Sequence, residues 1–365
     1  MDTAKTFAPN RILLWKAVAD HPEARRIIEM FPQARTEIVE RQSGVAIATH
    51  PSKHPIVLGK RVLMIGATNS FVRRFDGRLG GSVCCAPYFK LVPVSNGCPY
   101  YCTYCYLAYV YREYLPLIKM NINYDRMFAE IRQIAAGAPC ATSFNMGEML
   151  DSLALDHINH LTERLVPYFS RLRGGNLILL TKSSNVDGLL SATPNSRTVV
   201  SWSLNAQRMI EAYEPGTARL DDRIDAARRC QEHGYRLRLR IDPGILYPDW
   251  RAGYAEMVHR ALTILRPENI TLGMLRLLGG HFRLMGRAYG QRGRRLQATR
   301  LSDRGSDGKR RYSPMQRIEF YRFLMGLIRD HDKRVSIGLC REAADVWNVL
   351  RDQCDSRKCN CLIWS

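Results

Sequence analysis

The chain has 365 residues, of which 46% are hydrophobic and 24% are charged. This composition is typical of a globular protein, and the length suits one barrel-sized catalytic domain with additions at both ends. No stretch reaches the roughly 20 consecutive apolar residues that a membrane-spanning helix requires, so the sequence excludes a helical membrane protein.

Charge is the second general feature of the chain. Lysine and arginine outnumber aspartate and glutamate by 54 to 34, which gives a formal net charge of +20. A surplus of this size attracts polyanions and is common in nucleic-acid-binding proteins, although an arginine-rich proteome would also make many of its proteins basic. We therefore expect a nucleic-acid or phosphorylated partner, which the charge alone does not identify.

The amino terminus and the cysteine content bear on the compartment. The first residues, Met1–Lys5, are not followed by an apolar signal core, so we expect a cytoplasmic protein without a membrane partner. In that compartment the eleven cysteines are expected to be metal ligands or free thiols, because disulfides are rare there.

In chain order, residues 1–89 are predicted to form an N-terminal mixed α/β extension. Apolar residues at helical spacing predict helices at Asn10–Ala19 and Ala24–Met30, with polar connections between them. The apolar run Val62–Ile65 predicts a short strand that ends at Gly66.

Residues 90–278 alternate between strand-like and helical patterns. Six apolar runs predict strands at Leu91–Val94, Thr142–Met146, Leu177–Leu180, Thr198–Ser203, Leu237–Ile241 and Ile270–Leu275. The amphipathic stretches between them predict helices at Tyr124–Ala136, Asp156–Leu172, Val186–Leu190, Leu220–His233 and Tyr254–Leu265. This order indicates an α/β fold with a parallel sheet and outer helices. Six units instead of eight predict an open, partial (β/α)6 TIM-type barrel whose function lies at the carboxyl ends of the strands.

Residues 279–365 are predicted to form a basic loop, a final helix at Met315–Asp332 and a cysteine-rich tail. The basic residues of the loop, 283–311, are Arg283, Arg287, Arg292, Arg294, Arg295, Arg300, Arg304, Lys309, Arg310 and Arg311, with Tyr289 and Tyr312 interleaved. Such a loop can follow a phosphate backbone and stack bases, although a run of charge is often only a solvated insertion. Its place after the sixth strand favours contact with substrate.

Cysteines carry the strongest chemical signal. Cys98, Cys102 and Cys105 are spaced C-x3-C-x2-C in one short loop. Three thiolates in one loop can each bind a different iron of a cubane cluster, whereas complete protein ligation takes four cysteines. The triplet therefore predicts a [4Fe-4S] cluster with one iron open to another ligand. A zinc knuckle would require a nearby fourth ligand, and buried structural cysteines would not explain the aromatic residues of the loop.

Several segments around this loop resemble one family of the radical S-adenosylmethionine superfamily, the spore photoproduct lyase family. They are the approach Lys90–Ser95, the segment Thr181–Asp187 after the third strand, Ser201–Asn205 at the fourth strand, and Glu214–Thr217 followed by Leu220–Ala227. Weaker similarity covers residues 12–90, and the resemblance continues to about residue 275. It indicates the family strongly and the substrate only weakly.

The resemblance implies a particular chemistry and a set of site residues. S-adenosyl-L-methionine would bind the open iron, and one electron from the cluster would yield a 5′-deoxyadenosyl radical that abstracts hydrogen from the substrate. The expected cofactor-binding residues stand at strand ends: Gly147, Glu148, Lys182, Ser203 and Asp242. Tyr104 and Tyr106 match family tyrosines associated with hydrogen transfer. Each residue also has an ordinary structural alternative. Lys182 could be a surface lysine that caps its strand, Ser203 a buried hydroxyl bonded to its neighbours, and Asp242 an ordinary strand cap. The two tyrosines could serve only in packing.

One departure from the family concerns the return of hydrogen to the product. The family has a cysteine shortly after the second strand, and this chain has Glu148 at that position. Cys140 lies before the second strand, on the wrong end. The tail cysteines Cys340, Cys354, Cys359 and Cys361 could instead ligate an auxiliary cluster or zinc, or one of these thiols could reach the site as a hydrogen donor.

We therefore expect a lyase-like radical S-adenosylmethionine enzyme that acts on nucleic acid, in lesion repair or modification. It would bind DNA through the basic loop 283–311 and receive electrons from a flavodoxin or ferredoxin. One alternative is a related enzyme that modifies a peptide or small molecule and carries an auxiliary metal site in its tail. Another is a non-catalytic iron–sulfur protein that binds nucleic acid.

Overall fold

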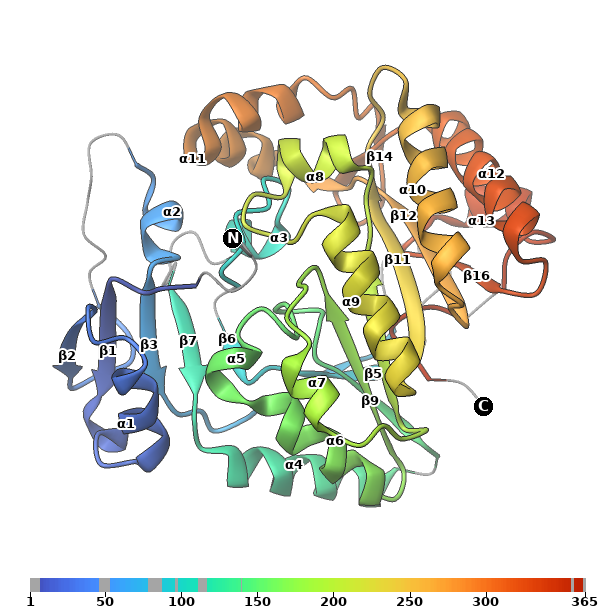
Figure 1. The fold of residues 1–365 in the computed structure, drawn as a ribbon. Coiled ribbons are helices and arrows are strands. Elements are labelled where there is room, and N and C mark those ends of the chain that lie inside the picture. Colours follow the sequence, from blue (N-terminus) through green and yellow to red (C-terminus); the bar gives the residue numbers. More distant parts are fainter. Residues whose placement is uncertain are drawn as a thin grey trace.

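The computed structural model describes residues 7–45, 53–77, 87–95, 98–110, 117–138, 140–355 and 358–363. Two mainly parallel sheets form the framework, one near the amino terminus and one through the centre of the molecule (Figure 1). Helices cover the larger sheet on its outer side, so the fold is α/β with parallel sheets, as expected from the alternating pattern.

The smaller sheet has the strand order β2-β1-β3-β7-β6. Its strands are β1 (Arg11–Trp15), β2 (Arg35–Val39), β3 (Val62–Gly66), β6 (Val94–Ser95) and β7 (Ile118–Asn121). The short helices η2 (Lys16–Val18), α1 (Pro22–Glu29) and α2 (Pro55–Gly59) accompany it. Helix α1 confirms the prediction at Ala24–Met30.

The predicted helix Asn10–Ala19 is wrong, because this segment forms β1 and the turn η2. Ile12, Leu13 and Leu14 are all buried, since β1 lies between β2 and β3 and both of its faces are covered. Strands covered on both faces have continuous apolar runs. Periodicity alone does not distinguish such a run from a buried helix.

The larger sheet has the order β16-β12-β11-β10-β9-β8-β5-β4. Its strands are β4 (Val72–Phe75), β5 (Tyr88–Leu91), β8 (Thr142–Asn145), β9 (Gly175–Thr181), β10 (Thr198–Ser203), β11 (Arg236–Gly244), β12 (Asn269–Met274) and β16 (Ser336–Leu339). All neighbouring pairs are parallel except β4 with β5. The six predicted strands therefore lie side by side in chain order, and β16 and β4 extend the sheet at its two edges.

The strand predicted at Leu91–Val94 is divided between the two sheets. Strand β5 ends at Leu91, and β6 begins at Val94 and pairs with β7 in the smaller sheet. Pro93 lies between them and lacks the N–H that a continuing ladder would use. The cysteine loop therefore follows β6.

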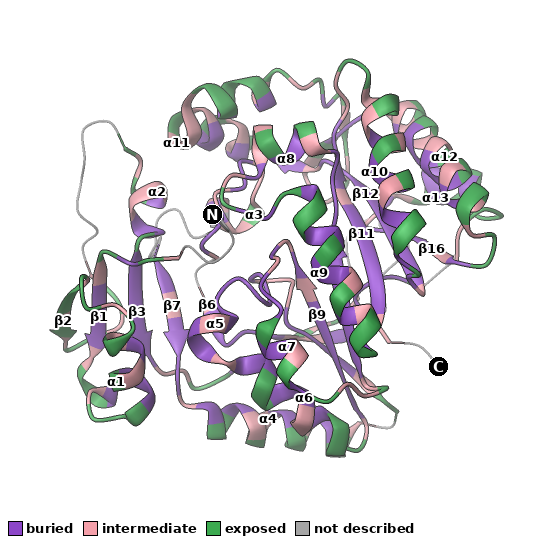
Figure 2. Cartoon of the chain, in the orientation of Figure 1, coloured by how far each residue is buried: buried purple, intermediate pink, exposed green. Residues whose placement is uncertain are grey.

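Helices between the strands lie where the amphipathic pattern predicted them, with small shifts at their ends. They are α4 (Tyr124–Gly137), α5 (Asp156–Asn159), α6 (Leu161–Arg171), α7 (Asp187–Ser191), α9 (Leu220–His233) and α10 (Trp250–Ile264). The short helices α3 (Tyr106–Val110) and α8 (Gln207–Tyr213) were not predicted. Figure 2 shows buried strands behind helices whose exposed residues face outward, which places the core between the sheet and these helices.

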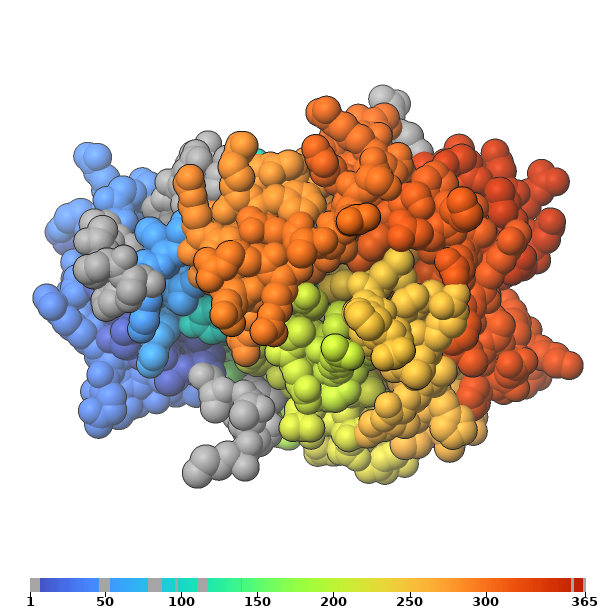
Figure 3. Space-filling model, turned by 90° about the horizontal axis from the view of Figure 1, so that it is seen from above, coloured from blue at the N-terminus to red at the C-terminus, as the bar shows by residue number. Residues whose placement is uncertain are grey.

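The predicted basic loop Gly279–Tyr312 is wrong as a loop. It contains helix α11 (Gly279–Gln297) and a small antiparallel sheet of β13 (Leu277–Leu278), β15 (Lys309–Arg311) and β14 (Asp303–Arg304). His281, Leu284 and Met285 are buried along one side of α11, with spacing that suits a helix. Its several glycines weaken the helical signal in the sequence, and Gly290 (φ 56°) interrupts the helix. Seen from above, this segment extends across one face of the molecule (Figure 3).

The chain ends with α12 (Pro314–His331), β16 and α13 (Ala344–Leu350). Helix α12 confirms the prediction at Met315–Asp332, and Ser313 caps it by accepting a hydrogen bond from the N–H of Gln316 at 3.3 Å. Strand β16 returns the tail to the larger sheet beside β12. No helix in the described ranges is both long enough and apolar enough to cross a bilayer.

Candidate active site

A cavity of about 280 Å³ lies at the carboxyl ends of the central strands. Its lining includes every residue predicted for the site: Cys98, Cys102, Tyr104, Cys105, Tyr106, Gly147, Glu148, Lys182, Ser203 and Asp242. These residues come from the cysteine loop and from the ends of β8, β9, β10 and β11. The carboxyl ends of parallel strands meet at one edge of a sheet, where α/β enzymes place their sites. The structure thus brings the predicted residues together, and their individual roles remain predictions.

The cysteine loop is fixed mainly through its backbone. The N–H groups of Tyr101 and Thr103 donate to the carbonyls of Pro215 and Tyr213 at 2.9 and 2.8 Å. Buried Lys60 donates from Nζ to the carbonyl of Cys98 at 2.9 Å and also to the carbonyl of Tyr100. The loop is therefore held before any cofactor binds.

The thiols of the loop fit a cubane cluster better than a single ion. Burial raises the pKa of Cys98 to about 12 and also raises that of Cys102. Such thiols become thiolates when a metal cation replaces the proton. Among the described residues, no three Cys, His, Asp or Glu side chains are grouped as ligands of one metal ion. Ligands that each bind a separate iron of a cluster need not converge in that way.

Lys182 and Ser203 form a pair next to the cysteine loop. Lys182 Nζ donates to Ser203 Oγ at 2.5 Å and lies 3.5 Å from Glu214 Oε1. The side chain of Lys182 is 16% exposed, whereas that of Glu214 is fully buried. The ammonium group of Lys182 is therefore accessible from the cavity, and the buried carboxylate of Glu214 holds it in place.

Glu214 is the centre of a buried network that the sequence did not reveal. It accepts from Arg223 Nη2 at 2.6 Å, and the phenol of Tyr104 also donates to it. Burial favours the neutral form of Glu214, but Lys182 and Arg223 outweigh it and lower its pKa to about 2. Burial and the nearby Glu214 charge raise the pKa of Tyr104 well above its ordinary value. Tyr104 is therefore a protonated phenol directed at Glu214.

Glu148 is held by arginines and contacts the tail. It accepts from Arg240 at 2.9 Å and from Arg341 at 3.4 Å. The Cys361 thiol donates to the same carboxylate at 3.5 Å. Burial alone would raise the pKa of Glu148, yet Arg240 and Arg341 lower it to about 2. Glu148 is therefore an ionised carboxylate whose two oxygens already have cationic partners.

Asp242 is positioned in a similar way. Its oxygens accept from Arg240 at 2.8 Å and from Arg276 at 3.0 and 2.9 Å. Although burial opposes ionisation, the two guanidinium groups hold the pKa of Asp242 well below its usual range. Arg276, Arg341 and Lys309 also line the cavity. Burial, with Arg341 and Arg276 nearby, lowers the pKa of Lys309 to about 8.

Gly147 has a packing reason for being glycine. A Cβ at this position would lie 2.2 Å from Leu180 Cβ and 2.9 Å from the Leu180 carbonyl oxygen, so the turn after β8 can pass close to β9 only without a side chain. Tyr106, by contrast, is 50% exposed, and Lys309 Nζ lies 5.4 Å from its ring centroid. Tyr106 is thus the more accessible of the two tyrosines predicted for the site.

Several residues that shape the site were not predicted from the sequence. Asp151 accepts from the N–H of Lys182 and from Thr181 Oγ1, both at 2.7 Å, and so fixes the end of β9. Lys60 comes from the smaller sheet region, and Arg341 follows β16. Glu214 lay in a segment recognised only for its family resemblance. No local pattern marked Lys60 or Arg341, because folding alone brings them to the cavity.

In the described ranges the tail cysteines are not grouped as ligands of a single metal ion, and an auxiliary cluster in the tail stays a prediction. Cys340, Cys354, Cys359 and Cys361 are included in the described ranges, where no group of metal ligands was found. Cys340 and Cys361 instead contact the arginine–carboxylate cluster: Arg240 Nη2 lies 3.2 Å from Cys340 Sγ. Among the lining residues of the cavity there is no tail cysteine.

Comparison with known proteins decides the family. A family model described as spore photoproduct lyase matches residues 7–288. The chain belongs to the spore photoproduct lyase family. It is therefore an enzyme of the radical S-adenosylmethionine superfamily, and the non-catalytic alternative is set aside.

Individual members of the spore photoproduct lyase family agree with this assignment. The chain is 29% identical to spore photoproduct lyase of Geobacillus sp. (strain Y412MC61) over 257 residues, which are 69% of this chain and 73% of the relative. It is 28% identical to the Bacillus subtilis (strain 168) protein, over 72% of this chain and 75% of the relative. A solved structure of spore photoproduct lyase complexed with dinucleoside spore photoproduct shares the fold, with a TM-score of 0.77 at 22% identity. That comparison covers 91% of this chain and 98% of the solved one.

Within this family, the match includes all ten predicted site residues and ends inside α11. Lys309, Arg341 and the tail lie beyond the matched residues. The part of the cavity formed by the predicted site residues therefore lies within the family match. Of the other cationic side chains that line the cavity, Arg276 lies within the match, whereas Lys309 and Arg341 lie outside it.

Proposed function

We propose that this enzyme repairs or modifies a lesion of the spore photoproduct type in DNA. In this proposal Cys98, Cys102 and Cys105 hold a [4Fe-4S] cluster, and the eight-stranded sheet corresponds to a partial TIM-type barrel around it. The observation that carries the proposal is the meeting of three cluster cysteines and five strand-end residues at one cavity. When bound, the cluster would supply the electron that cleaves S-adenosyl-L-methionine and starts the radical chemistry.

The chain offers separate positions for the polar groups of S-adenosyl-L-methionine. Lys182 and Ser203 carry a cation and a hydroxyl at the cavity, which suit the cofactor's carboxylate. Gly147, Glu148 and Asp242 line the adjacent side, where carboxylates suit the amino and ribose groups. A solved spore photoproduct lyase variant has bound AdoMet together with dinucleoside spore photoproduct, which supports a cavity shared by cofactor and substrate.

Substrate binding would use the cationic wall. Arg276, Lys309 and Arg341 line the cavity, and the basic segment 283–311 extends over the neighbouring face. These groups suit a nucleic-acid backbone better than an uncharged substrate. We further propose a flavodoxin or ferredoxin as electron donor and a cytoplasmic location. The auxiliary-metal alternative is less favoured, because Cys340 and Cys361 already contact Arg240 and Glu148.

Anaerobic turnover tests the proposal directly. The reconstituted protein, with reductant and S-adenosyl-L-methionine, is expected to convert a dinucleotide spore photoproduct into a dinucleotide with two unlinked thymine bases. Chromatography of the nucleotides and of 5′-deoxyadenosine follows the reaction. Cleavage of the cofactor without any lesion turnover would retain radical chemistry and reject the DNA lesion as substrate.

Replacement of Lys182 is expected to weaken cofactor binding. Lys182→Met removes the charge next to Ser203, so the Kd for S-adenosyl-L-methionine should rise by on the order of 10- to 100-fold, as expected for a lost charged hydrogen bond. Equilibrium dialysis measures this change. The exposed Lys333 provides the matched control, and Lys333→Met should bind normally. Equal affinities for both variants would contradict the assignment of Lys182.

We propose that Tyr106 returns a hydrogen atom to the product radical. Its phenol O–H would give a hydrogen atom to the product carbon radical, forming a C–H bond and a phenoxyl radical that an outside electron and a proton restore. Tyr104 is less suitable because its phenol is directed at Glu214, and Cys361 lies behind Glu148. Tyr106 lines the cavity and is half exposed.

We expect Tyr106→Phe to lower lesion turnover at least about tenfold, within the range of a lost hydrogen-transfer group, while cofactor cleavage continues. Product formed by the unaltered enzyme in deuterated water should carry deuterium, because a phenol proton exchanges with solvent. Mass spectrometry of the product measures both effects. Cys361→Ala should leave turnover unchanged; loss of turnover in that variant, with Tyr106→Phe active, would assign the donor role to the thiol.

A further inference from the structure

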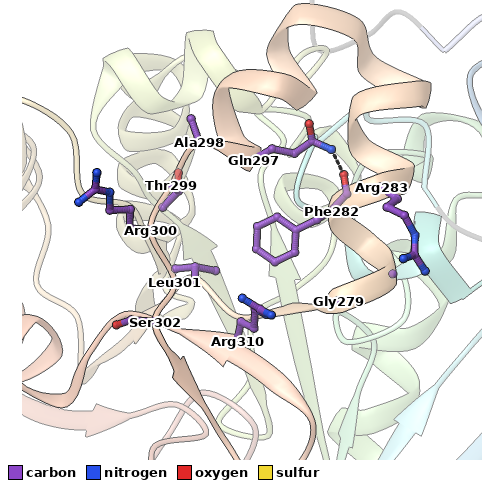
Figure 4. A pocket seen from close by; sticks show the side chains of 11 residues that line it. Gly279, Phe282, Arg283, Gln297, Ala298, Thr299, Arg300, Leu301, Ser302 and Arg310 are labelled. Atoms are coloured by element: carbon purple, nitrogen blue, oxygen red, sulfur yellow. Dashed lines mark hydrogen bonds between the residues drawn. The ribbon is translucent and has the colours of Figure 1, made fainter.

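A second and larger cavity lies on the outer side of the small antiparallel sheet. Its volume is about 810 Å³, within the range of small-ligand sites. It is formed by the start of α11, Gln297 at its end, the segment 298–302 after that helix, and Arg310 on β15. Figure 4 shows Phe282 in its middle, with Arg310 below the ring and Arg283 and Arg300 on opposite sides. None of the predicted site residues belongs to it.

The lining carries uncompensated positive charge. It contains three arginines and no acidic residue. Within the described part of the chain, Arg283 and Arg310 have neither an ion-pair partner nor a side-chain hydrogen bond. Most other arginines near the active site are neutralised, as Arg240 is by Glu148 and Asp242. Unpaired guanidinium groups around a cavity suit an anion, and phosphate in particular.

An aromatic ring and fixed polar groups accompany this charge. Phe282 is half-buried and faces the cavity (Figure 4). The side-chain amide of Gln297 donates to the Phe282 carbonyl, which fixes the ring's segment to the end of α11. A base can stack on such a ring, whereas inorganic phosphate would gain no favourable contact from it. Phosphate-binding charge beside a stacking surface indicates a nucleotide.

One strand separates this cavity from the active site. Successive side chains of a strand point to opposite sides, and on β15 Lys309 lines the active-site cavity while its neighbour Arg310 lines the outer one. The partner strand β13 pairs Leu278 with Lys309 and Leu277 with Arg310, so β13 and β15 form a shared wall. A ligand that occupies both cavities must therefore be a chain that passes around this wall.

We infer that the outer cavity binds a nucleotide that flanks the reacting lesion on the same DNA strand. Phe282 would stack on its base, and Arg310 with Arg283 would contact its phosphate. This inference rests on the proposed function, and it adds a place for the neighbouring nucleotide. Enzymes that act on a base within DNA use single-stranded substrate or take the target nucleotide out of the helical stack, and the outer cavity would hold the nucleotide next to it.

Binding of short single strands tests the inference without catalysis. Unlabelled oligothymidylates of two, three and four nucleotides compete with a labelled longer strand for the full-length protein, without reductant or S-adenosyl-L-methionine. The affinity of the competitor should rise by about tenfold at the length at which the added nucleotide reaches Phe282, because one more base is then stacked. This rise is the length step. Phe282→Leu should remove that step and keep the salt dependence. Arg310→Gln should also remove it and reduce the slope of log affinity against log salt by about 0.7, one phosphate contact on a single strand.

The matched control is Arg322→Gln, an exposed arginine on α12 that lies outside the basic segment and does not line the cavity, and it should keep the step. Equal steps in the unaltered protein, Phe282→Leu and Arg310→Gln would overturn the inference. Thymidine monophosphate binding that both variants weaken, with the length step intact, would also overturn it and assign the cavity to a free nucleotide. Absence of lesion turnover alongside a normal length step would count against the proposed function and leave the cavity assignment standing.

Discussion

Cys105→Ala is expected to remove the iron–sulfur cluster and with it the cleavage of S-adenosyl-L-methionine. Each loop cysteine would bind a different iron, so no neighbouring side chain replaces a lost ligand. The rate of cofactor cleavage should fall by more than the roughly 10- to 100-fold that removal of an outer hydrogen-bond partner costs a metal site. Iron content per chain, visible absorption and anaerobic formation of 5′-deoxyadenosine measure it.

Cys140→Ala is the control for that experiment. Cys140 is exposed and precedes β8, away from the cavity, so its replacement should leave iron and activity unchanged. Melting of both variants tests whether the loop remains folded, which its backbone bonds to Pro215 and Tyr213 favour. Retention of a full cluster by Cys105→Ala would contradict the assignment of the loop as the cluster site.

Glu214→Gln is expected to have the largest effect on stability. The neutral amide would leave the guanidinium of Arg223 buried without its counter-charge, since both side chains have no exposed area. Breaking a buried pair in this way typically costs about 3–5 kcal/mol. The variant should also lose activity, because Glu214 positions Tyr104 and Lys182. Denaturant titration and the Kd for S-adenosyl-L-methionine separate the two effects.

Glu211→Gln is the matched control, because Glu211 lies on the same helix end with a side chain that is 60% exposed. Its contact with Arg219, at 3.9 Å, should contribute little to stability. Similar free energies of unfolding for the two variants would contradict the buried network as a source of stability.

Acid stability follows from the same carboxylate. The folded protein lowers the pKa of Glu214 from 4.5 to about 2. The folded state therefore binds its proton less readily than the unfolded chain does. The contribution of Glu214 is complete above pH 4.5 and is lost as the pH falls through about 2. Glu214→Gln should show a weaker dependence of stability on pH in that window, measured by thermal unfolding at a series of pH values.

Local patterns and the family resemblance accounted for the central sheet and for ten of the residues that line the active-site cavity. Strand β10 coincides with its prediction at both ends, because Thr198–Ser203 is an uninterrupted buried run between turns. Lys182 and Ser203 were predicted from the family resemblance, supported by their positions after or at the end of such a run. Parallel strands bring their carboxyl ends together whatever the sequence between them, so residues at those ends become neighbours.

The sequence patterns gave wrong or incomplete predictions where long-range strand pairing or mixed helix and loop signals decided the structure. Leu13 lies in a strand covered on both faces, which a helix prediction also fits. The glycines and arginines of α11 conceal the buried side formed by His281, Leu284 and Met285. Strand β16 joins the sheet only through its pairing with β12, across more than sixty residues of chain. No local window contains that information.

By itself, the sequence predicted the chemistry of this protein, because the spacing of Cys98, Cys102 and Cys105 within one loop is a local feature. It also determined the order of the strands that carry Lys182, Ser203 and Asp242. Only the tertiary structure decided how these groups are charged and what surrounds them. Lys60, Glu214 and Arg341 are far apart along the chain, and their effects act through space over a few ångströms. The cavity beside Phe282 likewise exists only because α11 and β15 fold against each other.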